Sequence, residues 1–194
     1  MDSTLRSELV KKSIKKVFSL PSLKLTKLIA GSLTQSSQSQ DFYQQTVNAC
    51  LNMLTSLLSE APSLEALQDI LVHTNGWIDS TEIFGRKRAV KSTSFLMKYV
   101  SEHFDFDISQ DFPLLGQLVA LLSLHLADNV EEIGLQSAEA LYHLHCIMKA
   151  KMGEGGAGKG GVSCKPQGGR SAALQRLLQL PSSLSVGQAG CCWG

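Results

Sequence analysis

The helical character of this chain is clearest in WIDSTEIFGRKRAVKSTSFLMKYV, which runs from Trp77 to Val100. Its apolar and small side chains recur at the three- and four-residue spacing of one helix face. A long helix is therefore predicted to end near His103, although Gly85 weakens its beginning. Asp79 and Glu82 have the spacing of a capping box before it. The predicted inward face consists of Ala89, Thr93, Leu96, Met97, Val100 and Phe104.

A second stretch, PLLGQLVALLSLHLADNVEEIGLQSAEAL, runs from Pro113 to Leu141 and has a similar organisation. Leu114 to Ala127 is apolar almost all round, which predicts a helix that is buried on several sides. Asp128, with Glu131 three residues later, is expected to cap the last helix. The predicted inner face of that last helix consists of Ile133, Ser137, Leu141, Leu144 and Met148.

The order of helix, short loop and helix repeats through residues 41–152 without a strand pattern. Gly134 and Ala138 repeat the pair Gly85 and Ala89 at a distance of 49 residues, slightly longer than the ~40–47 residues of helical-pair repeats. Each pair has an apolar face that it cannot bury alone, and stacking buries these faces continuously. We therefore predict an all-α fold, a HEAT- or armadillo-like stack of helical pairs, over residues 41–152.

Two further helices are predicted in the first part of this stack. Asp41 stands three residues before Gln44, the spacing of a capping box that opens a helix. Ser63 is the expected N-cap of the next helix, and Asn75-Gly76 is its expected end. The predicted inward faces are Tyr43, Val47, Cys50, Leu54, Leu57 and Leu58 in the first helix, and Leu64, Leu67, Ile70 and Leu71 in the second.

The stretch from Trp77 to Val100 resembles the family of maestro HEAT-like repeat proteins, in which a tryptophan connector precedes a helix with a basic cluster and then Ala-Val. The stretch from Pro113 to Leu141 is similar to that family's next unit, a Leu-rich helix, an Asp turn and a helix with small residues inside. Gln136 replaces the basic residue that the general HEAT pattern has near the start of this helix. The resemblance covers about residues 41–152. It implies a short form or fragment of a long solenoid, with a binding role rather than a reaction.

Residues 1–40 are predicted to hold a basic amphipathic helix, a weak helix and a Ser/Gln-rich linker. The first helix is expected from about Thr4 to Leu20, and the weak helix from Leu23 to Leu33. The first helix separates its side chains cleanly at 100° per residue. One side carries Val10, Ile14, Val17 and Phe18, and the other carries Lys11, Lys12, Lys15 and Lys16.

The four lysines of this first helix have three interpretations. They can contact an anionic membrane or a nucleic-acid backbone, or belong to a helix that binds in a partner's groove. They can also form the solvated side of a helix that packs on the repeat stack, which we favour because the helix lacks Trp. Arg86 and Arg88 form a second basic cluster with Lys87, but consecutive helix residues point in different directions. The candidate interaction residues are Lys11, Lys12, Lys15, Lys16, Arg86 and Arg88.

Residues 153–194 differ in composition from the rest of the chain, because they hold 11 of its 16 glycines. Apart from Ala172–Leu180 they have no usable periodicity, so a Gly-rich, disordered tail is predicted. Gly153 to Lys159 match the first seven positions of a phosphate-binding loop. Such a loop needs a preceding strand, a following helix and Ser or Thr after Lys159. Gly160 stands there instead, so glycine richness alone explains the match.

The sequence contains no arrangement of side chains that predicts catalysis, a cofactor or a metal. Its five cysteines have neither disulfide nor zinc spacing. His143, His145 and Cys146 cannot share a metal on their own, because helix positions i and i+2 point about 200° apart. His125 lies in an apolar stripe and is expected to be a structural histidine with a hydrogen-bond partner near a helix end. We expect no enzymatic activity and no cofactor.

Composition and charge favour a soluble, cytoplasmic protein. The net charge of +1 gives no argument for nucleic-acid binding by the molecule as a whole. Lysines at positions 11, 12, 15 and 16 interrupt any signal-peptide core. The sequence also lacks a run of about 18 apolar residues, so no transmembrane helix is expected.

The function expected from these patterns is a non-enzymatic protein–protein interaction or scaffold module with an unidentified protein partner. The alternative is an adaptor that associates with an anionic membrane or nucleic acid through the N-terminal lysine-rich helix. No small-molecule substrate is expected. Self-association is expected at the exposed repeat end, near Leu141–Met148, unless Ala172–Leu180 covers it, because so few repeats are near the minimum for stability.

Overall fold

The computed structural model describes residues 3–20, 36–103 and 106–152. Within these ranges helices alternate with loops, and extended structure is limited to an isolated bridge between Ser63 and Asp107. The predicted all-α fold is confirmed. The predicted weak helix Leu23–Leu33 and the predicted tail 153–194 lie outside the described residues. The described elements are α1 (Ser3–Phe18), α3 (Ser36–Glu60), α4 (Leu64–Ile78), α5 (Ile83–Glu102), α6 (Leu115–Leu124), the 3-10 helix η1 (His125–Ala127) and α7 (Glu131–Lys151).

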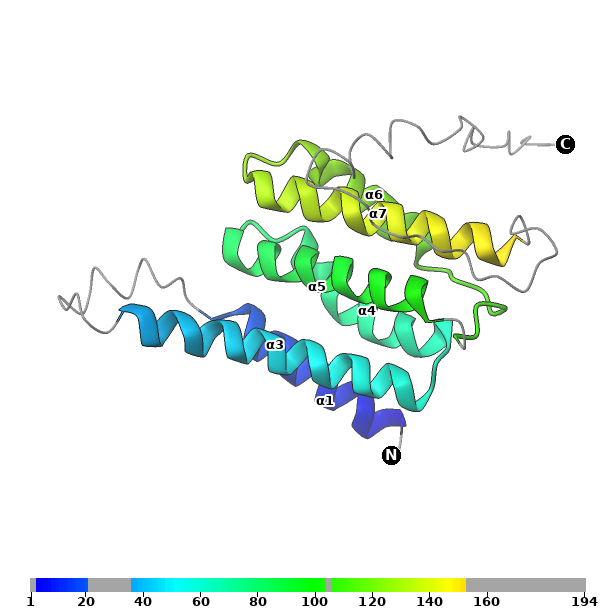
Figure 1. Cartoon of the computed structure of the whole chain (residues 1–194), viewed down its shortest axis with the longest axis horizontal. Helices are drawn as coiled ribbons and strands as arrows, with labels where there is room; N and C mark the ends of the chain where they lie inside the picture. The colour runs from blue at the N-terminus through cyan, green and yellow to red at the C-terminus, as the bar shows by residue number, and fades with distance from the viewer. Residues whose placement is uncertain (1–2, 21–35, 104–105, 153–194) are drawn as a thin grey trace, which may run out of the picture.

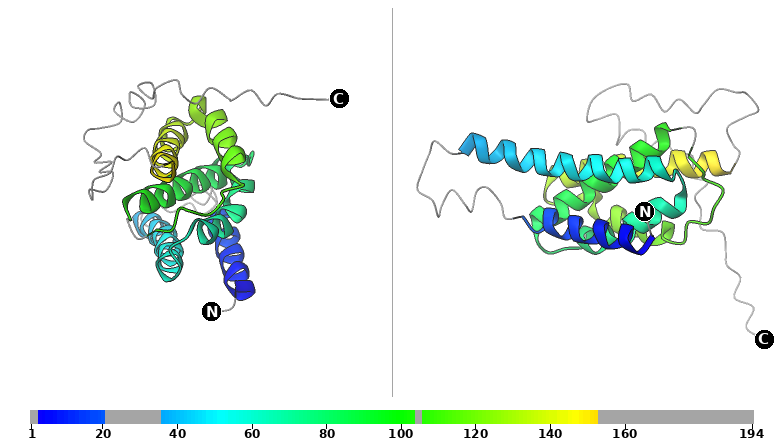
Figure 2. Two further views of the ribbon diagram at one scale, coloured as in Figure 1. Left: turned by 90° about the vertical axis from the view of Figure 1, so that its right-hand side faces the viewer. Right: turned by 90° about the horizontal axis from the view of Figure 1, so that it is seen from below.

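The helices form two layers (Figures 1 and 2). One layer contains α3, α5 and α7, and the other contains α1, α4 and α6. Contacts between the layers define the pairs α1/α3, α4/α5 and α6/α7, and the most extensive contact joins α5 to α7. This is the predicted stack of helical pairs. Its first pair takes one helix from residues 1–40, so α1 shares the apolar core of residues 41–152.

The two faces of α1 are those that its sequence predicts. Val10, Ile14, Val17 and Phe18 are buried in the common core. The four lysines of the same helix are exposed. Lys15 and Lys16 lie in the last turn, where a positive charge is favourable beside the negative end of the helix dipole. The helix therefore packs on the repeat stack and keeps its lysines in solvent.

The beginning of α3 differs from the prediction. The helix begins at Ser36, so Asp41 lies inside it and does not open it. A capping residue needs non-helical backbone, and the spacing of Asp41 and Gln44 could not reveal that the backbone is already helical there. The predicted inward stripe is confirmed, because Cys50, Leu54, Leu57 and Leu58 are buried.

The end of α4 also differs from the prediction. Ser63 is the N-cap as expected, and its hydroxyl accepts a hydrogen bond from the amide of Ala66 at 3.2 Å. Asn75-Gly76 does not end the helix, which continues to Ile78. The last turn buries Ile78 and places Trp77 edge-to-face with Phe18, at 5.9 Å between ring centroids. Burying such side chains contributes about 1.5–3 kcal/mol each, more than the ~1 kcal/mol cost of glycine.

The start of α5 uses one of the two predicted capping residues. Glu82 is the N-cap, and its carboxylate accepts a hydrogen bond from the amide of Gly85 at 2.5 Å. Asp79 is instead the C-cap of α4, so the predicted capping box is wrong. The predicted inward face is confirmed, because Ala89, Thr93, Leu96, Met97 and Val100 are buried.

The loop between α5 and α6 forms hydrogen bonds with the α3–α4 turn and with the end of α7. The amide of Asp107 donates to the carbonyl of Pro62 at 2.7 Å, and the Asp107 carbonyl accepts from the amide of Leu64 at 3.0 Å. Lys151, at the end of α7, donates to the carbonyls of Ser109 and Gln110. These bonds place the C-terminal end of α7 beside the loop that leads into α6.

The prediction for α6 is wrong in its burial. Only Leu118 and Leu122 of this helix are buried, whereas Val119 and Leu124 are exposed. The helix begins at Leu115, without a side-chain cap. An apolar sequence gives the composition of the helix but not the number of its neighbours. In the described part of the chain α6 has neighbours on one side of its own layer only, and its other side is open.

The repeated glycines occupy equivalent close contacts in two helical pairs. A Cβ atom at Gly85 would lie 2.9 Å from the Trp77 ring, and one at Gly134 would lie 2.9 Å from the Leu126 carbonyl oxygen. In each pair, the second helix thus approaches the end of the first helix at a position without a side chain. This contact accounts for the repetition of glycine 49 residues apart in the sequence.

Candidate functional site

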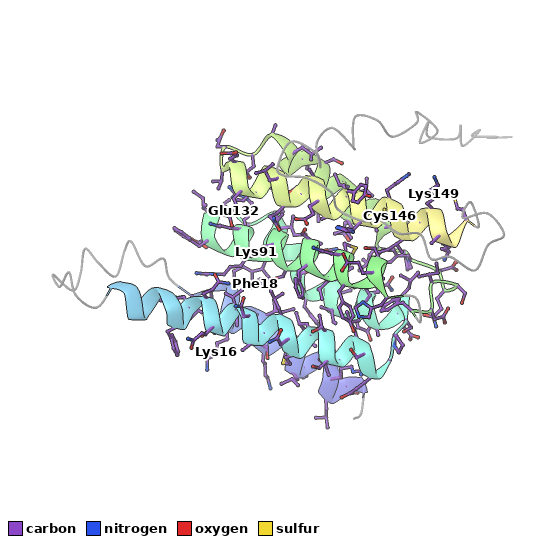
Figure 3. The ribbon with its side chains drawn as sticks, viewed as in Figure 1. Lys16, Phe18, Lys91, Glu132, Cys146 and Lys149 are labelled. Carbon is purple, nitrogen blue, oxygen red and sulfur yellow. The ribbon has the colours of Figure 1, made fainter. Side chains whose placement is uncertain are left out.

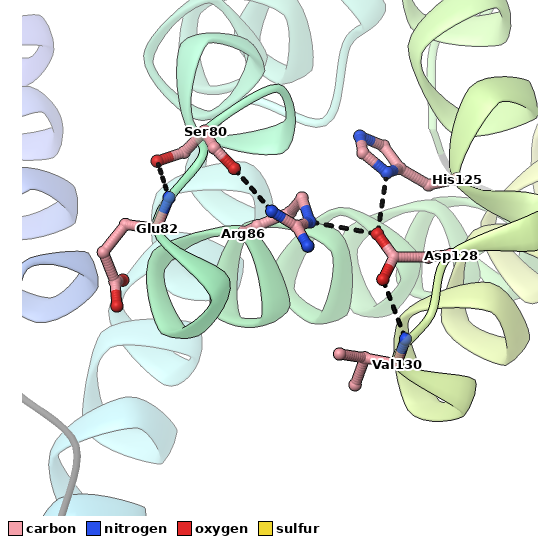
Figure 4. Close-up of polar contacts among 6 residues, drawn as sticks. All are labelled: Ser80, Glu82, Arg86, His125, Asp128 and Val130. Atoms are coloured by element: carbon pink, nitrogen blue, oxygen red, sulfur yellow. Dashed lines mark hydrogen bonds and ion pairs between the residues drawn. The ribbon is translucent and has the colours of Figure 1, made fainter.

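A buried ion pair joins the second helical pair to the third. The Nε atom of Arg86 donates to Oδ2 of Asp128 at 3.0 Å, and its Nη1 donates to the carbonyl of Ser80 at 2.7 Å (Figure 4). The side chains of Arg86 and Asp128 are only 15% and 6% exposed. Arg86 thus connects the α4–α5 turn to the turn before α7.

Asp128 is the centre of this junction. Its Oδ1 accepts from the amide of Val130 at 2.9 Å, and its Oδ2 also accepts from Nδ1 of His125 at 3.0 Å (Figure 4). Burial opposes the charged carboxylate, but the hydrogen bonds from Val130, Arg86 and His125 together lower the pKa of Asp128. The N-cap of α7 is Val130, so the predicted cap role of Asp128 is wrong. His125 has the structural partner that its sequence position requires.

Arg88 fastens α1 to α5. Its Nη1 donates to the carbonyl oxygens of Phe18 at 2.9 Å and Leu20 at 2.5 Å. These carbonyls lie at the end of α1, where a helix has no backbone partners of its own for them. Arg88 therefore supplies a cationic cap to a helix that is more than 60 positions away in the sequence.

Lys87 points away from both arginines and forms an ion pair with Glu132 at the start of α7. Figure 3 places Glu132 at the start of α7, beside the beginning of α5. The basic cluster of α5 is thus divided among three partners, as helix geometry predicts for consecutive residues. Arg86 and Arg88 are used in these internal contacts.

The lysines of α1 do not form one surface with the arginines of α5. Lys11 and Lys12 are exposed and lie 3.7 Å and 3.6 Å from carboxylate oxygens of Glu8. Arg88 instead contacts the end of α1 through backbone carbonyls. Of the six predicted interaction residues, the four lysines remain on an open face, and the two arginines are largely withdrawn from solvent.

The open side of α5 carries side chains that the sequence interpretation did not single out. Phe84 and Phe95 are 36% and 40% exposed, although both are large and apolar. They are eleven residues apart, about three helical turns, so they share a face. We call this face the α5 stripe, and the 3.6-residue period of its members is the sequence signal by which it could have been found. Its members are Phe84, Lys91, Phe95 and Lys98.

A buried histidine lies between α5 and α7. Nδ1 of His143 is 2.7 Å from the hydroxyl oxygen of Ser101, and the imidazole is almost completely buried. Burial lowers the pKa of His143 from its ordinary value of 6.5. In the described part of the chain, His143, His145 and Cys146 belong to no group of three or more His, Cys, Asp and Glu side chains that could hold a metal ion.

We expect His143 to make the stability depend on pH below its ordinary pKa of 6.5. Its pKa is lower in the folded chain than in the unfolded chain, so acid protonates the unfolded state first. Its contribution is therefore present above pH 6.5 and decreases as the pH falls, by at most about 1.4 kcal/mol per pH unit. Urea unfolding of wild type and His143→Gln at several pH values measures this slope.

The slope in this pH window should be smaller in His143→Gln than in wild type. Burial also lowers the pKa of His73, so the His73→Gln variant is measured in parallel to separate the two histidines. Equal slopes in wild type and His143→Gln would contradict the assignment to His143.

No helix among the described residues is both long enough and apolar enough to cross a membrane.

Comparison with known proteins agrees with the stack of helical pairs. The family model described as Maestro, HEAT repeats matches residues 84–156. This range contains α5, α6 and α7, and therefore the Arg86–Asp128 junction. No solved structure matches the chain.

Three human proteins illustrate the similarity. Maestro heat-like repeat family member 5 is 33% identical over 118 residues, 59% of this chain and 9% of that protein. Maestro heat-like repeat-containing protein family member 1 is 30% identical over 105 residues, 54% of this chain and 6% of that protein. Member 9 of the latter family is 27% identical over 165 residues, 84% of this chain and 26% of that protein. The chain thus spans only a small part of these relatives, and residues 84–156 are similar to HEAT repeats of the Maestro type.

Proposed function

We propose that this chain is a protein-binding module of HEAT type, which acts as a scaffold without a chemical step. The form of the stack supports the proposal, because pairs of helices joined side by side present long open faces. The similarity to Maestro HEAT repeats supports it as well. The observation that carries the proposal is the α5 stripe, two exposed phenylalanines among lysines on the middle helix of one layer.

The α5 stripe favours a partner segment with both apolar and acidic side chains. Phe84 and Phe95 offer aromatic surface that is partly in water, and aromatic residues near the centre of an interface often dominate its binding energy. Lys91 lies between them, and Lys98 follows one turn later. These positive charges complement carboxylates on a partner and speed its association.

The test compares two variants of the full chain. Phe84→Ala together with Phe95→Ala should weaken binding of the partner at least tenfold, because both anchors are removed while the core is untouched. Val72→Ala is the matched control, since Val72 is an exposed apolar residue on α4 in the other layer. Affinity capture with wild type identifies proteins, and titration of the purified partner against each variant measures the dissociation constant.

The proposal requires the double phenylalanine variant to lose affinity while Val72→Ala retains it. Thermal unfolding of each variant confirms that the fold is intact. Equal binding by wild type and the double variant would refute the α5 stripe as the docking surface. Higher salt should also slow association, because the lysines attract the partner through solvent-screened charge.

A further inference from the structure

The outer side of α6 is an apolar surface without a partner among the described residues. Val119 is 38% exposed and Leu124 is 73% exposed. Between Pro113 and Ala127 the sequence contains no Asp, Glu, Lys or Arg. We call this surface the α6 outer face. It consists of Gly116, Val119, Ala120, Ser123 and Leu124, all of which are exposed, and the exposed Gln117 lies at its edge.

The other helices of the same layer show what is missing at α6. Within this layer α1 packs against α4, and α4 packs against α6. Beyond α6 the described chain provides no further helix of the layer (Figure 2). A Cβ atom placed on Gly116 would meet nothing within 4 Å. The face thus has the small and apolar side chains of a helix contact, and space for a helix to approach.

We propose that the segment of this chain from residue 172 to residue 180 binds across the α6 outer face and covers it. This goes beyond the proposed protein-binding function, which uses a different surface. The segment reads AALQRLLQL. At 100° per residue Leu174, Leu177 and Leu178 fall within one arc, and Gln175, Arg176 and Gln179 fall on the opposite side. Its apolar side matches an uncharged surface, and its polar side would face water.

The end of α7 supports this choice of occupant. Lys151 is bonded to the carbonyls of Ser109 and Gln110, in the loop that leads into α6. The following chain therefore leaves beside the beginning of α6. The 19 residues from 153 to 171 can span up to about 60 Å when extended, whereas the ten residues of α6 extend only about 15 Å. A connection of this kind gives an effective concentration in the millimolar range, which favours the chain's own segment over a second copy.

The experiment is a double-mutant cycle in the full chain. The face variant is Val119→Glu with Leu124→Glu, and the segment variant carries Leu174→Glu, Leu177→Glu and Leu178→Glu. The control variant places the same three acids on the opposite side of the segment, as Gln175→Glu, Arg176→Glu and Gln179→Glu. Hydrogen exchange of the α6 amides is measured for each variant and for the combination of face and segment variants. Light scattering gives the oligomeric state.

The contact between segment and face predicts that the segment variant raises α6 exchange about tenfold, which corresponds to about 1.4 kcal/mol. The control variant should leave α6 exchange unchanged. The face variant should raise exchange in the wild-type background but add little in the segment variant, because the contact is already lost. The segment variant should also self-associate, because the apolar face becomes accessible.

Two outcomes would overturn the proposal. If α6 exchange is the same in wild type and the segment variant, the segment does not cover the face. If wild type is a dimer that the face variant dissociates and the segment variant does not, a second copy is the occupant. A cooperative thermal unfolding transition in each variant will show that its substitutions leave the stack folded.

Discussion

Replacing Asp128 with Ala should lower the free energy of unfolding by about 3 kcal/mol. The substitution leaves the Arg86 guanidinium largely buried without its carboxylate, and a buried charge without a partner is costly. It also removes the acceptor for the amide of Val130 and for Nδ1 of His125. The junction between the second and third helical pairs should therefore weaken as a unit. Urea unfolding followed by circular dichroism measures the change.

A second ion pair between the same two helical pairs provides the control. Lys87 and Glu132 also join α5 to α7, but their side chains are 38% and 46% exposed. Solvent screens such a pair, so Glu132→Ala should lower the free energy of unfolding by less than about 1 kcal/mol. Replacing both buried partners, as Arg86→Met with Asp128→Leu, should recover much of the loss, since no charge is then left without a partner. Equal costs for Asp128→Ala and Glu132→Ala would contradict this account.

The predictable part of the fold is the part that depends on spacing along one helix. The period of apolar side chains placed the buried faces of α1, α3, α4 and α5 correctly, because a helix contact selects residues three and four apart. Ser63 was also predictable, since its hydroxyl bonds to an amide three residues away. The repeated Gly and Ala at positions 85 and 89, and 134 and 138, indicated two successive helical pairs.

The unpredictable part depends on neighbours that are distant in sequence. Asn75-Gly76 has the local form of a helix end, but the burial of Ile78 and the contact of Trp77 with Phe18 extend the helix. The spacing of Asp128 is typical of a helix cap, yet Arg86, 42 positions earlier, donates a hydrogen bond to one of its carboxylate oxygens. A side chain with two potential partners cannot be assigned from local spacing alone.

The candidate sites follow the same division. The four lysines of α1 were placed on the solvent side by their period, and the structure leaves them there. Arg86 and Arg88 were candidates because they are charged, but each finds internal acceptors that only the packing of α5 against its neighbours provides. Phe84 and Phe95 were overlooked because an apolar residue in a helix is expected to be buried, and only the position of α5 in the layer exposes them.

Gly134 should be the most restrictive glycine among those in the described helices. We expect Gly134→Ala to destabilise the fold by about 2 kcal/mol, although alanine favours a helix over glycine by about 1 kcal/mol. The added Cβ would lie 2.9 Å from the backbone carbonyl oxygen of Leu126. A backbone atom in η1 cannot move aside as a flexible side chain can, so α7 must move away from η1. Thermal and urea unfolding measure the loss.

Gly76 provides the matched control for this prediction. It also lies inside a helix, but an added Cβ at Gly76 would meet nothing within 4 Å. Gly76→Ala should therefore stabilise the fold by up to about 1 kcal/mol, because only the helix propensity changes. Opposite signs for Gly76→Ala and Gly134→Ala would establish that close approach, and not helix propensity, selects glycine at position 134. If both substitutions stabilise the chain, α7 does not need this close contact with η1, and the repeated glycine has another cause.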